Sequence, residues 1–331
     1  MMDLSIIVAV YNVENYIRPC IKSIYRQGLH EDRFEVIIVN DGTQDRSMEM
    51  IADIIQEHNN IVVINQDNQG LSIARNNGLA IAKGEYLLMP DSDDMLIDNS
   101  VKPLLEKALA EKADIIMADL VQMNDEEIDN LSNHPINQQE NFKVTKISGN
   151  DLLKASYCRW YWRSIYRKGF LLDNNISFVP GIYAQDVPFT NECFLKVKKC
   201  FKTTWLLNIY RIGHQSASYR YSLKRAYNTS IAIRKAWKVS KSLPLSPDTR
   251  YKEDEVLFSL FYEHICSIAY GHLQNFSEVV KAISFLKENI PLLTFNHNMK
   301  QQIWSFMYNQ LPTKAFAFVI LAKQTLQKKF K

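Results

Sequence analysis

Leu87-Leu88-Met89-Pro90-Asp91-Ser92-Asp93-Asp94 is an apolar run that ends in three carboxylates within four positions. Such a run is typical of a buried strand that delivers clustered negative charge to the edge of a sheet. Acids this close repel one another unless a cation lies among them, and oxygen ligands suit a hard divalent ion such as Mg2+ or Mn2+. Because ligands bind at strand carboxyl ends in open α/β sheets, we predict a metal-assisted site for a phosphate-bearing substrate. The alternative is a solvated acidic turn that caps the following helix.

The segments around these acids alternate between apolar runs and stretches whose apolar residues recur at helical spacing. The expected strands are 4–10, 34–39, 61–64, 85–89 and 114–118. The expected helices cover 17–24, a segment capped by Asp45, 71–83 with Gly84 as its stop, and 101–110. This order predicts an α/β fold with a doubly wound, mostly parallel sheet, followed by a helical region beyond Tyr221.

Composition and charge restrict the class of protein. With 47% hydrophobic and 23% charged residues, the 331-residue chain has an ordinary globular composition rather than a disordered one. Residues 221–331 carry 16 Lys and Arg against 7 Asp and Glu, whereas the other 220 residues carry 23 against 29. A basic C-terminal region indicates an anionic partner, either a membrane surface or a nucleic acid.

Cysteine usage and the apolar runs indicate the compartment. The five cysteines are scattered, with no C-x-x-C pair, which argues against a disulfide framework or a zinc site and favours a reducing compartment. The first residues enter an apolar strand without a basic leader, and no run approaches the ~20 apolar residues that span a bilayer. We therefore expect a cytoplasmic protein, with peripheral attachment to the inner face of the cell membrane as the alternative.

Four polar signals follow the expected strands in order. They are Val10-Tyr11-Asn12, Asn40-Asp41-Gly42, a glycine loop at 68–76 and the acids at 91–94. In order and spacing they resemble family 2 glycosyltransferases of the GT-A fold, and the resemblance covers roughly residues 3–215.

The resemblance implies a nucleotide-sugar donor, a UDP-sugar above all. Asp41 would accept a hydrogen bond from the uracil imide N–H, and Gly70 and Arg75 would line the nucleotide and its sugar. The base pocket would be formed by the end of the first strand, at Val10, Tyr11 and Asn12.

The same resemblance identifies Asp91-Ser92-Asp93 as the D-x-D motif. Asp91 would lie near the ribose or the metal, Ser92 would line the nucleotide, and Asp93 would bind Mn2+ or Mg2+ directly, with Asp94 in the inner shell. The physical reason is independent of the family. A nucleoside diphosphate leaves poorly until a divalent ion neutralises the charge that grows on its β-phosphate.

Residues 181–189 resemble the Glu-Asp segment of the family, with Gln185 in place of the usual Glu. The resemblance makes Asp186 the general base that takes the proton of the acceptor hydroxyl as it attacks the anomeric carbon. Displacement in a single step inverts the configuration at that carbon. Pro188 predicts that Asp186 opens a helix, so the alternative is a capping aspartate.

Two further segments resemble parts of the family site. Arg211 and His214 follow an expected strand at 204–209 and would contact the diphosphate and the metal, respectively, although a lone surface histidine is the commoner case. An aromatic segment would lie beside the acceptor or else form core. It consists of Trp160, Trp162 and Arg163.

These assignments predict three regions: a nucleotide-sugar half at 1–120, an acceptor half at 121–220 and a helical C-terminal region at 221–331. Residues 313–331 read as a basic amphipathic helix that can lie on an anionic bilayer; the alternative is a helix whose apolar residues dock on the protein body.

We therefore expect an inverting, metal-dependent glycosyltransferase. It would move a sugar from a nucleotide sugar to a glycan or lipid-linked saccharide in surface polysaccharide biosynthesis. The alternative from another class is a non-catalytic nucleotide-sugar or glycan-binding protein. A dehydrogenase would need a G-x-G-x-x-G turn that the chain lacks, and we expect no nucleic-acid partner because only the charge of the tail suggests one.

Overall fold

The computed structural model describes residues 2–132, 135–136, 138, 142–153, 160–213, 222–270, 273 and 275–329. The chain divides into two compact units. The N-terminal unit consists of Met1–Leu152, Trp160–Gly181 and Lys196–His214. The C-terminal unit consists of Leu153–Arg159, Ile182–Leu195 and Gln215–Lys331. The functional division expected at residues 120 and 220 stays a prediction.

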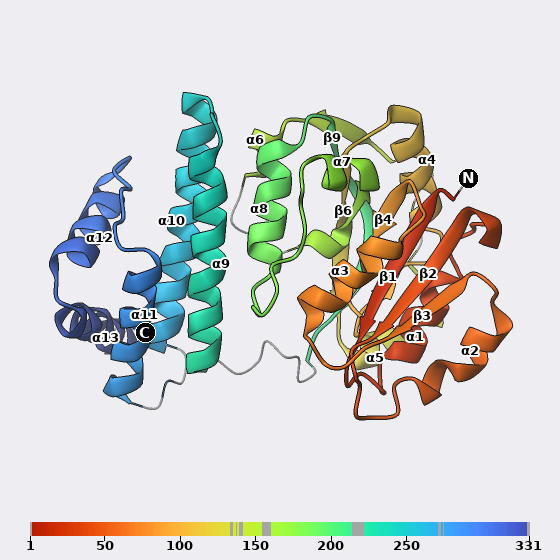
Figure 1. Ribbon diagram of the computed structural model, residues 1–331, viewed down its shortest axis with the longest axis horizontal. Coiled ribbons are helices and arrows are strands. Elements are labelled where there is room, and N and C mark those ends of the chain that lie inside the picture. The colour runs from red at the N-terminus through yellow and green to blue at the C-terminus, as the bar shows by residue number, and fades with distance from the viewer. Residues whose placement is uncertain are drawn as a thin grey trace. The chain divides into compact units, whose positions relative to one another are not determined.

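Within the described residues, the N-terminal unit contains a nine-stranded sheet in the order β3-β2-β1-β4-β8-β6-β9-β5, with β7 paired to β9 (Figure 1). The strands are β1 Leu4–Val10, β2 Phe34–Asn40, β3 Ile61–Asn65, β4 Tyr86–Leu88, β5 Met95–Leu96, β6 Ile115–Met123, β7 Val144–Ile147, β8 Ser164–Arg167 and β9 Cys200–Arg211. The run β3-β2-β1-β4 is parallel, and β8 enters antiparallel between β4 and β6. The predicted doubly wound, mostly parallel sheet is confirmed.

Helices of the N-terminal unit connect these strands. They are α1 Ile17–Ile24, α2 Ala52–Glu57, α3 Leu71–Ile81, α4 Val101–Glu111, α5 Asp125–Asp129, α6 Gly149–Leu152 and α7 Lys168–Asp173. Helix α1 buries Ile17, Ile21 and Ile24, the residues whose helical spacing predicted it. The helix expected after Asp45 is shorter than predicted, because a 3-10 turn at Glu49–Ile51 precedes α2.

Two glycines let the chain pass close to β1. A Cβ at Gly78 of α3 would lie 2.4 Å from Ile7 Cγ2, and one at Gly84 would lie 2.4 Å from the backbone of Leu4. The helix stop that we expected at Gly84 therefore has a different cause. Helix α3 already ends at Ile81, and Gly84 is required because the chain crosses the backbone of β1 there.

The strand order reverses at β1, since β2 and β3 lie on one side of it and β4 on the other. The carboxyl ends of β1, β2 and β4 meet at one edge of the sheet because the three strands are parallel. In open α/β sheets such a reversal point opens the crevice in which ligands bind. The polar segments at 10–12, 40–43 and 91–94 follow these ends directly.

The C-terminal unit is helical, as expected. Its helices are α8 Asp186–Lys196, whose last residue belongs to the N-terminal unit, α9 Leu223–Ser242, α10 Pro247–Tyr270, α11 Phe276–Asn289, α12 Met299–Gln310 and α13 Thr313–Lys329. Side chains of Ser222, Asn275 and Asn298 cap α9, α11 and α12 by accepting backbone hydrogen bonds. Within the described part of the chain, no helix combines the length and apolarity that crossing a bilayer requires.

Candidate active site

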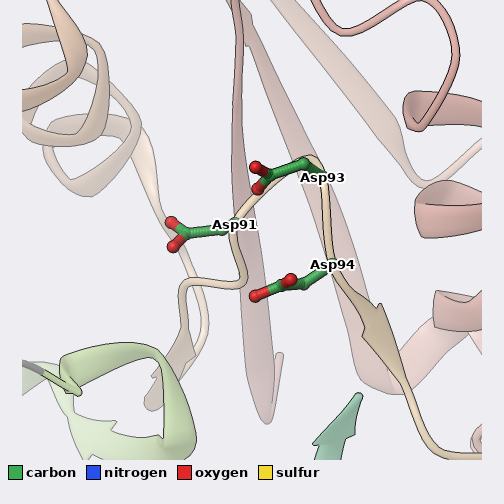
Figure 2. A group of neighbouring side chains, drawn as sticks. All are labelled: Asp91, Asp93 and Asp94. Carbon is green, nitrogen blue, oxygen red and sulfur yellow. The ribbon is translucent and has the colours of Figure 1, made fainter. Parts of the chain in front are cut away.

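The acids predicted to cluster lie on one turn between β4 and β5. The backbone N–H of Asp94 donates to the carbonyl of Asp91 at 3.1 Å, which closes the turn. Asp91, Asp93 and Asp94 each present a carboxylate oxygen, and these oxygens lie within 4.8 Å of one another. Figure 2 shows the three side chains on the same side of the turn. The acidic segment is therefore a convergent cluster at the strand edge, not a helix cap that disperses its charges.

Asp94 is the buried acid of this cluster. It is 1% exposed; its Oδ1 accepts from the Arg211 N–H at 2.9 Å, and its Oδ2 has no hydrogen-bond partner among the described residues. Burial, reinforced by Asp91 and Asp93, raises the pKa of Asp94 well above its ordinary value. Burial also raises the pKa of Asp91. Carboxylate oxygens that repel one another, with Asp94 Oδ2 unpaired among the described residues, fit a hard divalent cation.

Arg75 of α3 lies directly against residues 91–94, which we call the acid turn. It is 2% exposed, forms an ion pair with Asp91, and places its guanidinium carbon 4.4 Å from the ring centre of Tyr161 and 5.3 Å from that of Phe178. The Tyr161 hydroxyl donates to the same Asp91 oxygen at 2.6 Å. Arg75 Nη1 is buried without a hydrogen-bond partner in the described part of the chain. The predicted site thus brings Arg75 and Asp91 together and adds Tyr161.

Asp41 shapes the glycine loop that precedes α3. The carboxylate is 2% exposed and accepts from Gln66 Nε2 at 2.8 Å, from the Gln69 N–H at 2.8 Å and from the Gly70 N–H at 2.9 Å. Two of these bonds go to Oδ1 and one to Oδ2, so Oδ2 keeps the capacity to accept another. Gly70 has φ +87°, which explains the glycine. The hydrogen bond to uracil stays a prediction.

The end of β1 is tied to the loop after β2. Val10 is buried and Tyr11 is 45% exposed, and Asn12 has a left-handed φ of 54°. The Asn12 N–H donates to Thr43 Oγ1 at 2.8 Å, and its side-chain oxygen accepts from the Gln44 N–H at 3.0 Å. These bonds hold an exposed aromatic ring at the carboxyl edge, where the base pocket was predicted.

Asp45 anchors the same loop, a role that sequence reasoning did not identify. Its carboxylate accepts from the Glu14 N–H at 2.9 Å, from Thr43 Oγ1 at 2.7 Å and from the Ser47 hydroxyl. Hydrogen bonds from Ser47, Thr43 and the backbone outweigh partial burial and lower the pKa of Asp45. The available signal is the Thr-x-Asp-x-Ser spacing, whereas the expected helix cap is wrong because the Asp45 carboxylate bonds the loop instead.

Arg211 at the end of β9 holds the acid turn from its other side. Its N–H donates to Asp94, its Nε donates to the Asp93 carbonyl at 3.0 Å, and its guanidinium pairs with Asp125. The guanidinium carbon also lies 4.9 Å from the ring centre of Tyr16. The structure therefore gives Arg211 a positioning role, and its phosphate contact stays a prediction. Ser92 is half-buried within the turn, and the predicted metal ligand His214 lies outside the described residues.

The remaining predicted residues divide between two settings. Asp186 opens α8 in the C-terminal unit, which confirms the helix start but does not test its role as a base. Trp162 is 5% exposed and stacks on Tyr210 with ring centres 5.4 Å apart, and Arg163 is 2% exposed. Both have the burial expected of core residues. Trp160 is half-buried, with the Arg163 guanidinium 4.7 Å from its ring centre.

The mostly parallel sheet, with the acid turn at its carboxyl edge and Arg75 buried against that turn, matches the GT-A glycosyltransferase arrangement that the sequence predicts. The sequence model described as Glycosyl transferase family 2 matches residues 5–170, and the chain belongs to this family.

Relatives and solved structures agree with this assignment. The chain is 35% identical over 213 residues to the uncharacterized glycosyltransferase EpsJ of Bacillus subtilis, which covers 63% of this chain and 60% of EpsJ. It is 24% identical over 315 residues to the uncharacterized glycosyltransferase YibD of Escherichia coli, covering 94% and 87% of the two chains. The crystal structure of S. aureus TarS 1–349 in complex with UDP-GlcNAc matches with a TM-score of 0.70 at 17% identity, over 97% of this chain and 88% of that one. This last likeness shows the fold.

Proposed function

We propose that the chain is an inverting, metal-dependent glycosyltransferase that uses a UDP-sugar and a glycan or lipid-linked saccharide acceptor of a surface polysaccharide. The acid turn carries the proposal: three carboxylate oxygens lie within 4.8 Å of one another, and Asp94 Oδ2 has no partner among the described residues. The TarS complex contains UDP-GlcNAc, which supports a uridine nucleotide. The acceptor and a place on the inner face of the membrane are supported by the basic C-terminal region.

The donor would occupy the carboxyl edge of β1, β2 and β4. Asp93, with Asp91 and Asp94 beside it, would hold Mn2+ or Mg2+, and a bound ion supplies charge neutralisation for the departing diphosphate. Arg75 Nη1, buried without a partner in the described part of the chain, would donate to the sugar or phosphate of the donor. Tyr11 would face the base.

Asp186 would act on the acceptor. Its carboxylate would take the proton of the attacking hydroxyl, and the new bond to the anomeric carbon would form on the face opposite the leaving diphosphate. The acceptor oxygen becomes the glycosidic oxygen, the diphosphate leaves with the bonding electron pair, and the anomeric configuration inverts. Asp186→Asn should therefore spare UDP affinity and abolish turnover.

The test combines a donor screen with variants of the acid turn. UDP-, GDP- and dTDP-sugars are compared by thermal shift with Mn2+, Mg2+ or EDTA, and release of radiolabelled sugar is then measured. We expect stabilisation by a UDP-sugar that needs the metal, and at least ~100-fold slower turnover in Asp93→Ala. The matched control is Asp98→Ala, a carboxylate that is 56% exposed and lies outside the turn.

Each other outcome rejects a stated part of the proposal. Stabilisation by a GDP-sugar alone would reject the uridine assignment. Full turnover by Asp93→Ala in EDTA would reject metal dependence. Binding of the donor without hydrolysis or transfer for any acceptor would favour the non-catalytic binding protein.

A further inference from the structure

Helix α12 carries an exposed apolar stripe, defined as Met299, Ile303 and Phe306. These residues are 76%, 50% and 66% exposed. Their spacing of four and then three residues places them on one face of the helix. Isolated exposed apolar residues are ordinary, but a continuous row of large ones marks a surface that meets another apolar phase.

The opposite face of α12 fixes the helix in the C-terminal unit. The Trp304 ring lies 5.3 Å from that of Tyr262 on α10, and the Tyr308 ring lies 5.1 Å from that of Phe261. Both α12 residues also contact Phe316 of α13, edge to face. Helix α12 is therefore already packed on the protein through this face. The stripe is a second apolar face of the same helix, and it is exposed.

The described side chains of helix α13, up to residue 322, do not form such a face. Its Phe316 and Ile320 are 0% and 3% exposed, so these apolar residues dock on the protein, as the alternative interpretation of residues 313–331 predicts. Phe318 is the exception, at 67% exposed. An apolar contact with a membrane therefore has to come mainly from α12.

The charge around the stripe identifies the partner. Residues 290–331 contain six lysines and no Asp or Glu. Lys300 and Lys314 in the first turns of α12 and α13 are exposed. The acids that contact this region, Asp254 and Glu255 of α10, lie on the packed side of α12, where they meet His297 and the buried Gln301. The exposed side therefore combines apolar side chains with exposed lysines, which complements a layer of negative headgroups above hydrocarbon. A second copy of the chain is a poorer fit, because a two-fold contact through this face would bring two acid-free, lysine-bearing segments together.

We propose that the stripe of α12 inserts into the headgroup region of an anionic membrane, while the exposed Lys300 and Lys314 contribute electrostatic attraction. The proposal does not depend on the sugar-transfer assignment. It places the protein at the surface where a lipid-linked acceptor would be found.

Flotation of the full chain with vesicles tests this surface. We expect binding to vesicles of phosphatidylcholine and phosphatidylglycerol in equal parts, little binding to phosphatidylcholine alone, and weaker binding at high salt. The triple variant Met299→Ser, Ile303→Ser, Phe306→Ser should bind at least ~10-fold more weakly. The matched control is Ile81→Ser with Leu172→Ser, which removes apolar residues of the N-terminal unit that are 42% and 63% exposed.

A second variant keeps the test valid if the triple variant folds poorly. Phe306→Trp retains an apolar ring, and its fluorescence should shift to the blue with phosphatidylglycerol vesicles but not with phosphatidylcholine vesicles. The proposal is overturned if Phe306→Trp shows no shift, or if the triple variant floats as the wild type does. A dimer in sedimentation that the triple variant converts to a monomer, without vesicle binding, would assign the stripe to a second copy instead.

Discussion

Asp94 is subject to two opposing effects: burial favours its protonated form, whereas metal binding requires its ionised form. Its carboxyl is 1% exposed, and burial with two neighbouring carboxylates raises its pKa well above the ordinary value. The folded protein therefore keeps this proton at a pH where the unfolded chain has released it, so the stabilising contribution of the carboxyl falls as the pH rises toward the folded pKa. A metal ion competes with the proton for the Asp94 carboxylate. The negative charge that destabilises the metal-free protein is therefore the charge that binds the ion.

Asp94→Asn should separate these effects. Without the ion, we expect a higher melting temperature at neutral pH, by roughly 2–4 °C, because asparagine does not titrate and therefore avoids the loss of stability that the raised pKa of Asp94 causes above its ordinary pKa, and the Arg211 N–H keeps an acceptor. Stabilisation by Mn2+ should shrink in the same variant. Thermal unfolding between about pH 4 and 8, with and without Mn2+, measures both, and Asp98→Asn is the matched control. Equal Mn2+ stabilisation in Asp94→Asn and wild type would contradict the ligand assignment.

Tyr161 gives a second prediction for a single side chain. Tyr161→Phe removes the hydroxyl that donates to Asp91 at 2.6 Å but keeps the ring over Arg75. A hydrogen bond to a charged group contributes about 1.5–3 kcal/mol to stability, so we expect a lower melting temperature. Because Asp91 also loses a positioning partner, we expect kcat/KM to fall at least ~10-fold. Tyr161→Ala should also lower the melting temperature, because Arg75 loses its stacking partner. Tyr251→Phe, at a tyrosine that is 48% exposed, is the control. An unchanged kcat/KM in Tyr161→Phe would show that Asp91 does not need this donor.

The sequence alone could predict some of these partners and not others. Asp91, Asp93 and Asp94 are adjacent in the chain, so their clustering follows from the local turn. Tyr161 lies 70 residues from Asp91, and no local pattern links a tyrosine to a carboxylate at that separation. Arg75 could be assigned to the site through its family motif, but its direct pairing with Asp91 depends on where the packing of α3 against β1 and β2 places this side chain.

At the level of elements, strands β1, β2 and β4 were predictable because both of their faces are buried. Strand β1 is buried at all seven positions and therefore reads as a continuous apolar run. Strands β6 and β9 run further than predicted, to Met123 and from Cys200, since they pair with each other through a bulge past polar residues such as Asp119. Pairing across the chain, rather than local apolarity, sets those ends.

The contact of α3 with β1 yields a prediction at the same scale. Gly78→Ala places a methyl group where Ile7 Cγ2 lies, at 2.4 Å, so we expect a loss of about 1–3 kcal/mol in the free energy of unfolding. Ile7→Ala removes that methyl group and should make the double variant more stable than the sum of the two single changes predicts. Urea unfolding of the four proteins measures the coupling. Strictly additive losses would show that the crowding with Ile7 is not the reason for the glycine.

Across the whole molecule, one buried acid in the C-terminal unit should make stability depend on pH. Glu253 of α10 is 0% exposed and accepts from Asn191 Nδ2 of α8 at 3.0 Å, so it links the helix that opens with Asp186 to the rest of the unit. Burial raises the pKa of Glu253 from 4.5 to about 7. The folded state therefore holds a proton that the unfolded chain releases above its ordinary pKa, and stability is lost as the pH rises from there through about 7.

Glu253→Gln should remove this dependence, because glutamine keeps an oxygen acceptor for Asn191 and does not titrate. At pH values above the raised pKa the variant should be more stable than the wild type by up to about 3 kcal/mol, and the difference should shrink in mild acid. Melting temperatures of both proteins across this range provide the measurement, with Glu288→Gln as a control at an exposed glutamate of α11. If Glu253→Gln follows the wild-type pH profile, Glu253 is ionised in the fold. The hydrogen bond from Asn191 of α8 would then go to a charged Glu253 carboxylate of α10, and other contacts in the unit would have to stabilise that charge.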